Sequence, residues 1–459
     1  MFGKALEVLR VPELRKKILW TLGLLLAYRL GNYVLLPGVH AEEFRERLGA
    51  GSGGVVGILN ALSGGALGSA TVFSLGVMPY ISASIVFSLL QKMVPALEQV
   101  AKEGQSGQRK INQWTRWATV PICLFQATVT VTTLIAKDVA ENGVDSLIPP
   151  ELFASFFYKC ALVGLLTAGT LLIMWIGEKI TEHGIGNGTS LIIMAGIIAR
   201  LPTQISSSFI GDPDNRKQFV AEIIAIFIIS VLAVVFFTKA QRRVPIQQAK
   251  LTRGRRQLGG ARHFIPLKVS AVGVMPIIFA QTLFVIPSML GNAPGLGFIN
   301  EYLGYESFLY LVLYTALIYF FSFFWTAVMF QPKEMANNLK EHGSFIPGTR
   351  PGQRTADFLE GVMVRVTLVG ATFLAVIALF PYFANTFIGT AGGRGIAFAI
   401  GGTSILITVG VCLDLVDKIN AQLVMRNYEG FTSGQATSGG WARRREGGPA
   451  AGQLSGGAD

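Results

Sequence analysis

The sequence predicts an all-α polytopic membrane protein with ten transmembrane helices in two inverted halves of five. Composition is the first observation: 51% of the 459 residues are hydrophobic and only 14% are charged, whereas a soluble domain has about 25% charged residues. Ten long apolar stretches are the second observation, and two motifs that recur five stretches apart are the third. This composition argues against a soluble enzyme, a coiled coil or a disordered chain.

Each apolar stretch approaches or exceeds the roughly 20 residues that a helix needs to cross a bilayer. The expected spans are residues 18–36, 72–94, 115–135, 153–176, 185–201, 219–238, 270–290, 308–330, 362–384 and 396–417. We expect spans one to five in an N-terminal half, 1–205, and spans six to ten in a C-terminal half, 206–430. The polar, Gly-rich segment 431–459 is expected to be a disordered tail.

Loop charges predict the orientation of the spans. The net charge is +12, and most of the 39 Lys and Arg residues fall in one set of alternating loops. The positive-inside rule places that set in the cytoplasm, so both termini are expected there. Much of the basic charge is therefore explained by topology and does not require a nucleic-acid partner.

Two motifs each occur twice, and each pair joins span n to span n + 5. Span two contains Gly76-Val77-Met78-Pro79, and span seven contains Gly273-Val274-Met275-Pro276. Span five begins Gly188-Thr189-Ser190 and continues to Ile193, while span ten begins Gly402-Thr403-Ser404 and continues to Ile407. Because five is odd, the two copies cross the membrane in opposite directions. This is the pattern of an inverted repeat, in which a pathway lies at the interface of the repeats.

The four repeated helices contribute aliphatic residues at matched positions, namely Val77, Ile81, Ile193, Ile278 and Ile407. Such side chains cannot coordinate ions, but they can form a constriction that closes by dewetting. A secondary transporter is the alternative, and a mid-membrane carboxylate or a substrate-dependent ion current would favour it. A membrane-embedded enzyme is a third class, yet the chain has no HExxH or GxxxxGK[ST] motif. No catalytic residue, cofactor or metal is expected.

Three segments between the spans have distinctive compositions. Residues 239–268 hold nine basic and no acidic residues, which indicates either an orientation signal beside anionic lipid or a docking surface for an acidic partner or ribosomal RNA. Residues 331–361 carry both signs of charge with paired Pro and Gly residues, as a shaped loop does. Residues 49–71 hold an apolar piece too short to cross, and this segment could be re-entrant.

The chain resembles the SecY family, the central subunit of bacterial protein-conducting channels, from roughly residue 10 to residue 430. The resemblance is carried by several motifs. They are Ser63-Gly64-Gly65-Ala66-Leu67, Met78-Pro79-Tyr80-Ile81-Ser82-Ala83-Ser84, Glu103-Gly104-Gln105-Ser106-Gly107-Gln108-Arg109-Lys110-Ile111, Gly177-Glu178-Lys179-Ile180-Thr181-Glu182, Gly184-Ile185-Gly186-Asn187-Gly188, Pro266-Leu267-Lys268-Val269 and Phe345-Ile346-Pro347-Gly348-Thr349-Arg350-Pro351-Gly352.

The resemblance implies a channel for unfolded secretory polypeptides, with an hourglass pore and a lateral gate between spans two/three and seven/eight. Signal sequences and membrane helices would reach lipid through that gate. The implied pore ring is Val77, Ile81, Thr189, Ile193, Ile278 and Ile407. The implied plug, about 57–71, includes Asn60, Ser63, Gly64, Gly65 and Leu67. Docking of a motor or ribosome is implied for Arg243, Arg255, Arg256 and Arg350.

The same resemblance implies the partners and the location of the chain. SecE and SecG would be membrane subunits, while the SecA motor ATPase or a translating ribosome would drive nascent polypeptides and their signal sequences through the channel. The location would be the bacterial inner (plasma) membrane, in contact with lipid, as a multi-pass protein.

Thr189 departs from the aliphatic residue usual at its place in the ring. Its hydroxyl can bond the carbonyl four residues back in a helix, here that of Ile185, which would turn the methyl toward the pore. The alternative is a hydroxyl that faces the lumen and wets the seal. We expect the first arrangement, because an unsatisfied hydroxyl in a dry site costs about 1–3 kcal/mol.

Overall fold

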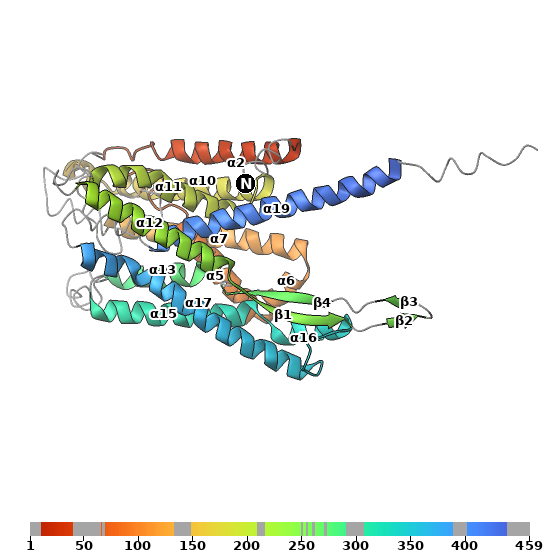
Figure 1. Cartoon of the computed structure of the whole chain (residues 1–459). Coiled ribbons are helices and arrows are strands. Elements are labelled where there is room, and N and C mark those ends of the chain that lie inside the picture. Colours follow the sequence, from red (N-terminus) through yellow and green to blue (C-terminus); the bar gives the residue numbers. More distant parts are fainter. Residues whose placement is uncertain are drawn as a thin grey trace, which may run out of the picture.

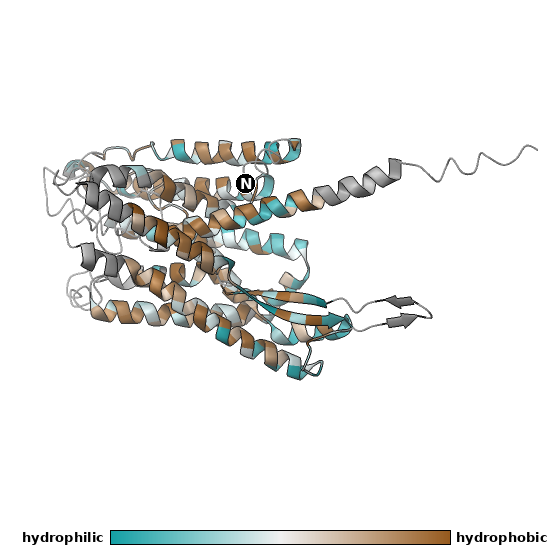
Figure 2. Cartoon of the chain, in the orientation of Figure 1, coloured by the Kyte–Doolittle hydropathy of each residue, from teal (hydrophilic) through white to brown (hydrophobic). Residues whose placement is uncertain are grey.

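The computed structural model (Figure 1) describes residues 11–39, 66, 69–132, 148–208, 216–248, 251–253, 256–258, 262–269, 273–290, 307–388 and 402–437. Within these residues, long helices lie side by side and a β-hairpin extends beyond one end of the bundle. Hydrophilic residues gather on that hairpin and on the adjoining helix ends, while the middle of the bundle is hydrophobic (Figure 2).

Among the described residues, ten long helices overlap the ten expected spans. In the first half they are α2 (Pro12–Gly31), α5 (Met78–Met93), α7 (Gln105–Thr130), α10 (Phe156–His183) and α11 (Gly188–Ser208). In the second half they are α12 (Arg216–Lys239), α13 (Met275–Leu290), α15 (Phe308–Met329), α17 (Gln353–Ile388) and α19 (Gly402–Thr437). Shorter helices are α6 (Pro95–Lys102), α9 (Pro150–Ala154) and α16 (Pro332–Glu341).

By length and apolar composition, three described stretches qualify as membrane crossings. They are Phe156–His183, Phe308–Glu341 and Gln353–Phe380, and the α5–α6 pair, bent by 97°, would be a fourth. The total of ten spans stays a prediction, with which the ten long helices agree.

Several boundaries differ from the expected ones. The helices α5 and α13 begin at Met78 and Met275, later than the spans expected from 72 and 270. The first half extends through Ser208, where α11 ends, and α19 continues to Thr437, into the segment expected to be a tail. Residues 438–459 of that tail lie outside the described residues.

Helix contacts repeat between the two halves. In the first half α5 packs on α7, α7 on α10, α10 on α11, and α2 on both α10 and α11. The second half repeats four of these contacts five helices later, as α13–α15, α15–α17, α17–α19 and α12–α19. The fifth, α12–α17, contains the stacked rings of Phe237 and Phe373, whose centroids are 3.6 Å apart. The packing therefore has the twofold repetition that the motifs predict.

A small β-sheet interrupts the helical pattern and was not predicted. Strands β1 (Gln241–Gln248) and β4 (Arg262–Lys268) form an antiparallel hairpin, and β5 (Ser344–Phe345) pairs with the other edge of β1. Strands β2 (Leu251–Arg253) and β3 (Arg256–Leu258) pair with each other farther along the hairpin. The two polar loops expected at 239–268 and 331–361 thus share one sheet.

The corner between α10 and α11 depends on close backbone approach. Thr181 Oγ1 donates to the Gly177 carbonyl at 2.9 Å and accepts a hydrogen bond from the Gly188 amide at 2.8 Å. Thr21 Oγ1, on α2, accepts a hydrogen bond from the Ile185 amide at 3.2 Å. A Cβ at Gly188 would overlap the Gly177 carbonyl oxygen. Three helices are therefore locked together where α11 begins.

We expect Gly188→Ala to destabilise the protein, because the new methyl must push α11 away from α10. Overpacking of this kind costs about 1–3 kcal/mol, measurable as a lower free energy of unfolding in detergent or as faster proteolysis in membranes. Gly164→Ala, in the same α10, is the matched control, because a Cβ there meets no atom within 4 Å. Equal stability of the two variants would show that the corner tolerates expansion.

Candidate functional site

Four segments far apart in the sequence meet at an apolar constriction. Met78, Ile193, Ile197 and Ile407 form one buried cluster, and Ile81, Val274 and Val411 pack against it. These residues come from α5, α11, the turn before α13, and α19. They are the same four regions that carry the repeated motifs.

The repeated motif in α5 and α13 is a helix start. Gly76 and Gly273 have left-handed φ angles of 59° and 64°, which glycine adopts without a steric penalty. In each copy Pro lies within the first turn, where its missing N–H costs no hydrogen bond. The Pro residues therefore begin these helices and do not kink them.

This start sets the positions of the constriction residues. Ile81 donates its amide hydrogen to the Val77 carbonyl at 3.0 Å, and Ile278 does the same to the Val274 carbonyl at 3.3 Å. Val77 and Ile81 are thus related by the repeat to Val274 and Ile278. The exposed fractions of Val77, Ile193, Ile278 and Ile407 are 4%, 7%, 5% and 3%, whereas Ile81 is half-buried.

Only some of the predicted ring residues belong to the same buried cluster. Ile81, Ile193 and Ile407 share the cluster, whereas Val77 belongs to the adjoining core with Phe73, Ile173 and Leu191. Ile278 is buried one turn after Val274. Val274 was missing from the predicted ring, although the repeated Gly-Val-Met-Pro motif could have identified it as the counterpart of Val77.

The expectation for Thr189 was wrong. Its hydroxyl donates to Asn187 Oδ1 at 2.7 Å, not to the Ile185 carbonyl, and its amide donates to the same oxygen at 3.2 Å. The reason is that α11 begins at Gly188, so Asn187 caps the first turn and Ile185 precedes the helix. A Cβ built on Gly177 of α10 would lie 3.2 Å from the methyl carbon of Thr189. The Thr189 methyl therefore faces α10.

The predicted plug residues Asn60, Ser63, Gly64, Gly65 and Leu67 lie outside the described residues. The described residues between the plug and α5 are held by hydrogen bonds. Leu36 and Val72 donate their amides to the Ala70 and Val34 carbonyls at 2.9 and 3.0 Å, and Ser74 Oγ donates to the Ala66 carbonyl at 3.1 Å. The chain leading into α5 is therefore tied to the segment after α2.

The β1–β4 hairpin and the turn after β5 form a second candidate site. Gln247 and Gln248 of β1 pair with Phe345 and Ser344 of β5. Below this sheet, Val244, Leu267, Ile346 and Leu359 join a core with α17. Arg243 is exposed on β1, whereas Arg255 and the side chain of Arg256 lie outside the described part.

The turn that carries Arg350 is held by hydrogen bonds. Thr355 Oγ1 donates to the Arg350 carbonyl at 2.8 Å, and Thr355 itself is 2% exposed. Thr349 donates both its amide and its hydroxyl to the Ile346 carbonyl, at 3.1 and 3.2 Å. The exposed Arg350 side chain therefore projects from a fixed backbone.

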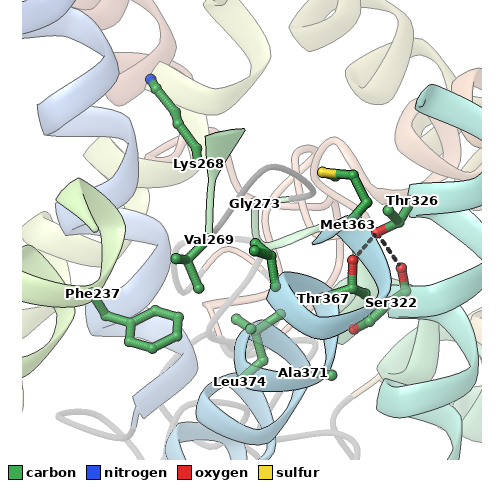
Figure 3. Close-up of a pocket in the computed structure, with 12 residues that line it drawn as sticks. Phe237, Lys268, Val269, Gly273, Ser322, Thr326, Met363, Thr367, Ala371 and Leu374 are labelled. Atoms are coloured by element: carbon green, nitrogen blue, oxygen red, sulfur yellow. Dashed lines mark hydrogen bonds between the residues drawn. The ribbon is translucent and has the colours of Figure 1, made fainter. Parts of the chain in front are cut away.

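The root of the hairpin is fixed on α15 and α17 beside a small pocket (Figure 3). Thr367 Oγ1 of α17 donates to Thr326 Oγ1 of α15 at 3.1 Å. A Cβ at Gly370 would lie 2.7 Å from the carbonyl oxygen of Val269. The glycine therefore allows α17 to pack closely against the end of the hairpin. Lys268 Nζ points away from the pocket and lies 4.0 Å from Asp417 Oδ2 of α19.

Comparisons with known proteins agree with this architecture. The SecY family model matches residues 71–416. The Protein translocase subunit SecY of Streptomyces galbus is 41% identical over 432 residues, which cover 92% of this chain and 98% of the relative. The protein of the same name from Mycobacterium tuberculosis H37Rv is 41% identical over 448 residues, 94% of this chain and 100% of the relative.

Solved structures share the fold at low sequence identity. A protein-conducting channel covers 89% of this chain and 93% of its own, with a TM-score of 0.58 and 18% identity. Sec61 from a canine ribosome–channel complex of the endoplasmic reticulum covers the same shares, with a TM-score of 0.54 and 16% identity. The family match and the relatives, which span nearly the whole chain, show that this chain belongs to the SecY family.

Proposed function

We propose that the apolar constriction is the seal of a protein-conducting channel, through which unfolded secretory polypeptides cross the membrane. One observation carries the proposal: Ile81, Val274, Ile193 and Ile407 converge from the four segments that carry the repeated motifs. An aliphatic constriction holds too few hydrogen-bonding groups to keep water when empty, so it blocks ions. The same surface selects no particular peptide sequence, which suits a channel with many substrates.

The proposed lateral gate is the seam between the α5–α7 pair and the α13–α15 pair. Within each pair the two helices pack together, and Phe279 of α13 stacks on Phe321 of α15 with centroids 5.2 Å apart. Each pair can therefore move as a unit. Signal sequences and membrane helices would pass between the pairs into lipid.

Two further elements complete the proposal. The segment 57–71 would be the plug, and the anchored stretch from Thr71 to Gly76 would hold its end near α5. The two halves around the pore would be those expected at 1–205 and 206–430. Their boundary moves to Ser208, where α11 ends.

The partners are inferred from the surface and the relatives. SecE and SecG would cover apolar helix faces that are exposed in the isolated chain, such as Leu19, Leu22 and Leu26 of α2, which are 61%, 58% and 64% exposed. SecA or a ribosome would dock on the hairpin and the Arg350 turn, since Arg contacts carboxylates and phosphates in a fixed, bidentate geometry. The relatives named above are bacterial, which supports the bacterial plasma membrane as the location, with both termini cytoplasmic.

The seal is tested by Ile278→Asn. The amide should hydrate the constriction, so reconstituted channels should show a higher resting ion conductance, and cells should export proteins with weakly hydrophobic signal sequences. Ile278→Val is the control, because it keeps an aliphatic side chain and should stay tight. A tight resting channel in the Asn variant would remove Ile278 from the seal.

The docking surface is tested by Arg350→Glu. We expect motor-driven export to fall by about tenfold or more, because the reversed charge repels the partner's acidic group, while the variant still assembles in the membrane. Lys340→Glu, a charge reversal at an exposed position of α16, is the control for net charge and should export normally. Unimpaired export by Arg350→Glu would exclude this turn from docking.

Topology is tested by single cysteines at Arg255 and Asn292. In a background without Cys123, Cys160 and Cys412, a membrane-impermeant thiol reagent added to intact cells should label position 292 and spare position 255, as the charge distribution predicts. The opposite labelling pattern would invert the orientation.

A further inference from the structure

Strand β4 is an open edge of the small sheet at the polar end of the bundle. The strand order is β4-β1-β5, so β1 has a neighbour on both sides, whereas β4 pairs with β1 alone among the described residues. An edge strand presents a row of unpaired backbone N–H and C=O groups, and proteins usually blunt or cover such a row. The seven residues of β4 therefore raise the question of what pairs with them.

One hydrogen bond at the root of the hairpin shows which backbone groups of β4 point outward. The Val269 amide donates to the Ala240 carbonyl at 3.0 Å, and this pair continues the register in which Gln241 lies opposite Lys268. Opposite pairs in an antiparallel ladder alternate between hydrogen-bonded and non-hydrogen-bonded ones. Every second residue counted back from Val269 therefore turns its backbone groups toward β1. The residues that turn them outward are Arg262, Phe264, Pro266 and Lys268.

Pro266 agrees with this assignment and blunts the edge only in part. Proline has no backbone N–H to donate, so within a sheet it is confined to positions that do not donate to the ladder, and the outward set is such a position. It removes one donor from the edge. Arg262, Phe264 and Lys268 each keep an N–H and a C=O that point away from β1. The edge therefore offers a short, interrupted row of backbone hydrogen bonds.

Phe264 adds an apolar contact in the middle of this edge. Ile265 and Leu267 belong to the core with α17, and because side chains alternate along a strand, Phe264 lies on the opposite face. Its side chain is 58% exposed. An exposed aromatic ring beside open backbone groups can pack on a side chain of an added strand.

The edge leads toward the apolar constriction. Lys268, at the end of β4, is six residues before Val274, which packs in the constriction cluster. Lys268 Nζ also lies 4.0 Å from Asp417 Oδ2 of α19, the helix that carries Ile407. Farther from the bundle, the hairpin and α19 diverge (Figure 1). A chain extended along β4 would therefore be directed toward the constriction.

We propose that β4 binds the translocating polypeptide itself, as an added antiparallel strand, before that polypeptide reaches the constriction. This inference rests on the proposed function, because it takes an unfolded secretory chain as the occupant. Such a chain has unpaired backbone donors and acceptors along its whole length, and main-chain pairing supplies affinity without selecting a sequence. The donor missing at Pro266 keeps the pairing short, so the chain is released and can advance.

The direction of β4 determines the direction of the added strand. From Arg262 to Lys268, β4 runs toward the bundle. A polypeptide that enters with its N-terminal part ahead runs from its C-terminal to its N-terminal end along the same path. It is therefore antiparallel to β4, which is the slightly more stable arrangement of two strands.

Disulfide cross-linking to an arrested substrate tests the added strand. The substrate is a secretory protein that stops inside the channel because its C-terminal domain is locked in the folded state, and it carries one cysteine at successive positions. In full-length channels without Cys123, Cys160 and Cys412, Phe264→Cys should cross-link to every second substrate position over about four to six residues, because strand side chains alternate. His263→Cys, on the opposite face, should cross-link to the positions in between. Equal cross-linking at all positions, no cross-link, or a cross-link only to a second copy of the channel would overturn the inference.

Export rates supply a second test. Phe264→Pro removes the outward N–H and leaves the bonds to β1 intact, whereas Phe264→Ala removes the ring and keeps the N–H. We expect Phe264→Pro to export about threefold to tenfold more slowly than Phe264→Ala, as the loss of one hydrogen bond predicts. Equal rates in the two variants would also contradict the added strand.

A cysteine in the constriction separates this inference from the proposed function. Ile407→Cys should cross-link to the same arrested substrate. If it does so while Phe264→Cys does not, the added strand is wrong and the proposed channel stands. If Ile407→Cys does not cross-link either, both proposals fail.

Discussion

The position at which α5 and α13 begin controls the geometry of the constriction. Each helix starts inside the bundle, after a left-handed glycine and with Pro in its first turn. Because the first helical hydrogen bond joins Ile81 to Val77, and Ile278 to Val274, the aliphatic residues of the first turn have fixed positions. If either helix began a residue earlier or later, its face would rotate by about 100° and these side chains would leave the site.

The start of α11 is fixed by contacts with α10, and these contacts also position a constriction residue. Gly188 touches the backbone of α10, Thr181 accepts its amide hydrogen, and Asn187 caps the first turn. These contacts fix the direction in which α11 leaves the corner, and hence the place of Ile193 in the apolar cluster. Thr189 satisfies its hydroxyl locally at the cap, so the polar atom that sequence reasoning treated as a risk to the seal has a partner on its own turn.

At the other end of the bundle, the pairing of β1 with β5 joins residues that are 96 to 98 positions apart in the chain, Gln248 with Ser344 and Gln247 with Phe345. Through the core of Val244, Leu267, Ile346 and Leu359, this sheet packs on α17. The same α17 packs on α15 and α19. A force applied to the hairpin or to the Arg350 turn can therefore reach the helices around the constriction through packed side chains.

The sequence by itself determined the helical class, the membrane setting, the twofold repeat and most of the aliphatic residues, because hydrophobic runs and repeated motifs are local or periodic signals. The repeated Gly-Val-Met-Pro motif also identifies Val274 as the counterpart of Val77. Tertiary structure alone decided the hydrogen bond of Thr189, the pairing of β1 with β5 and the close approach of Gly188 to the backbone of α10. Each of these depends on where a helix begins or on which distant group lies opposite, and a linear sequence does not encode such distances in any single segment.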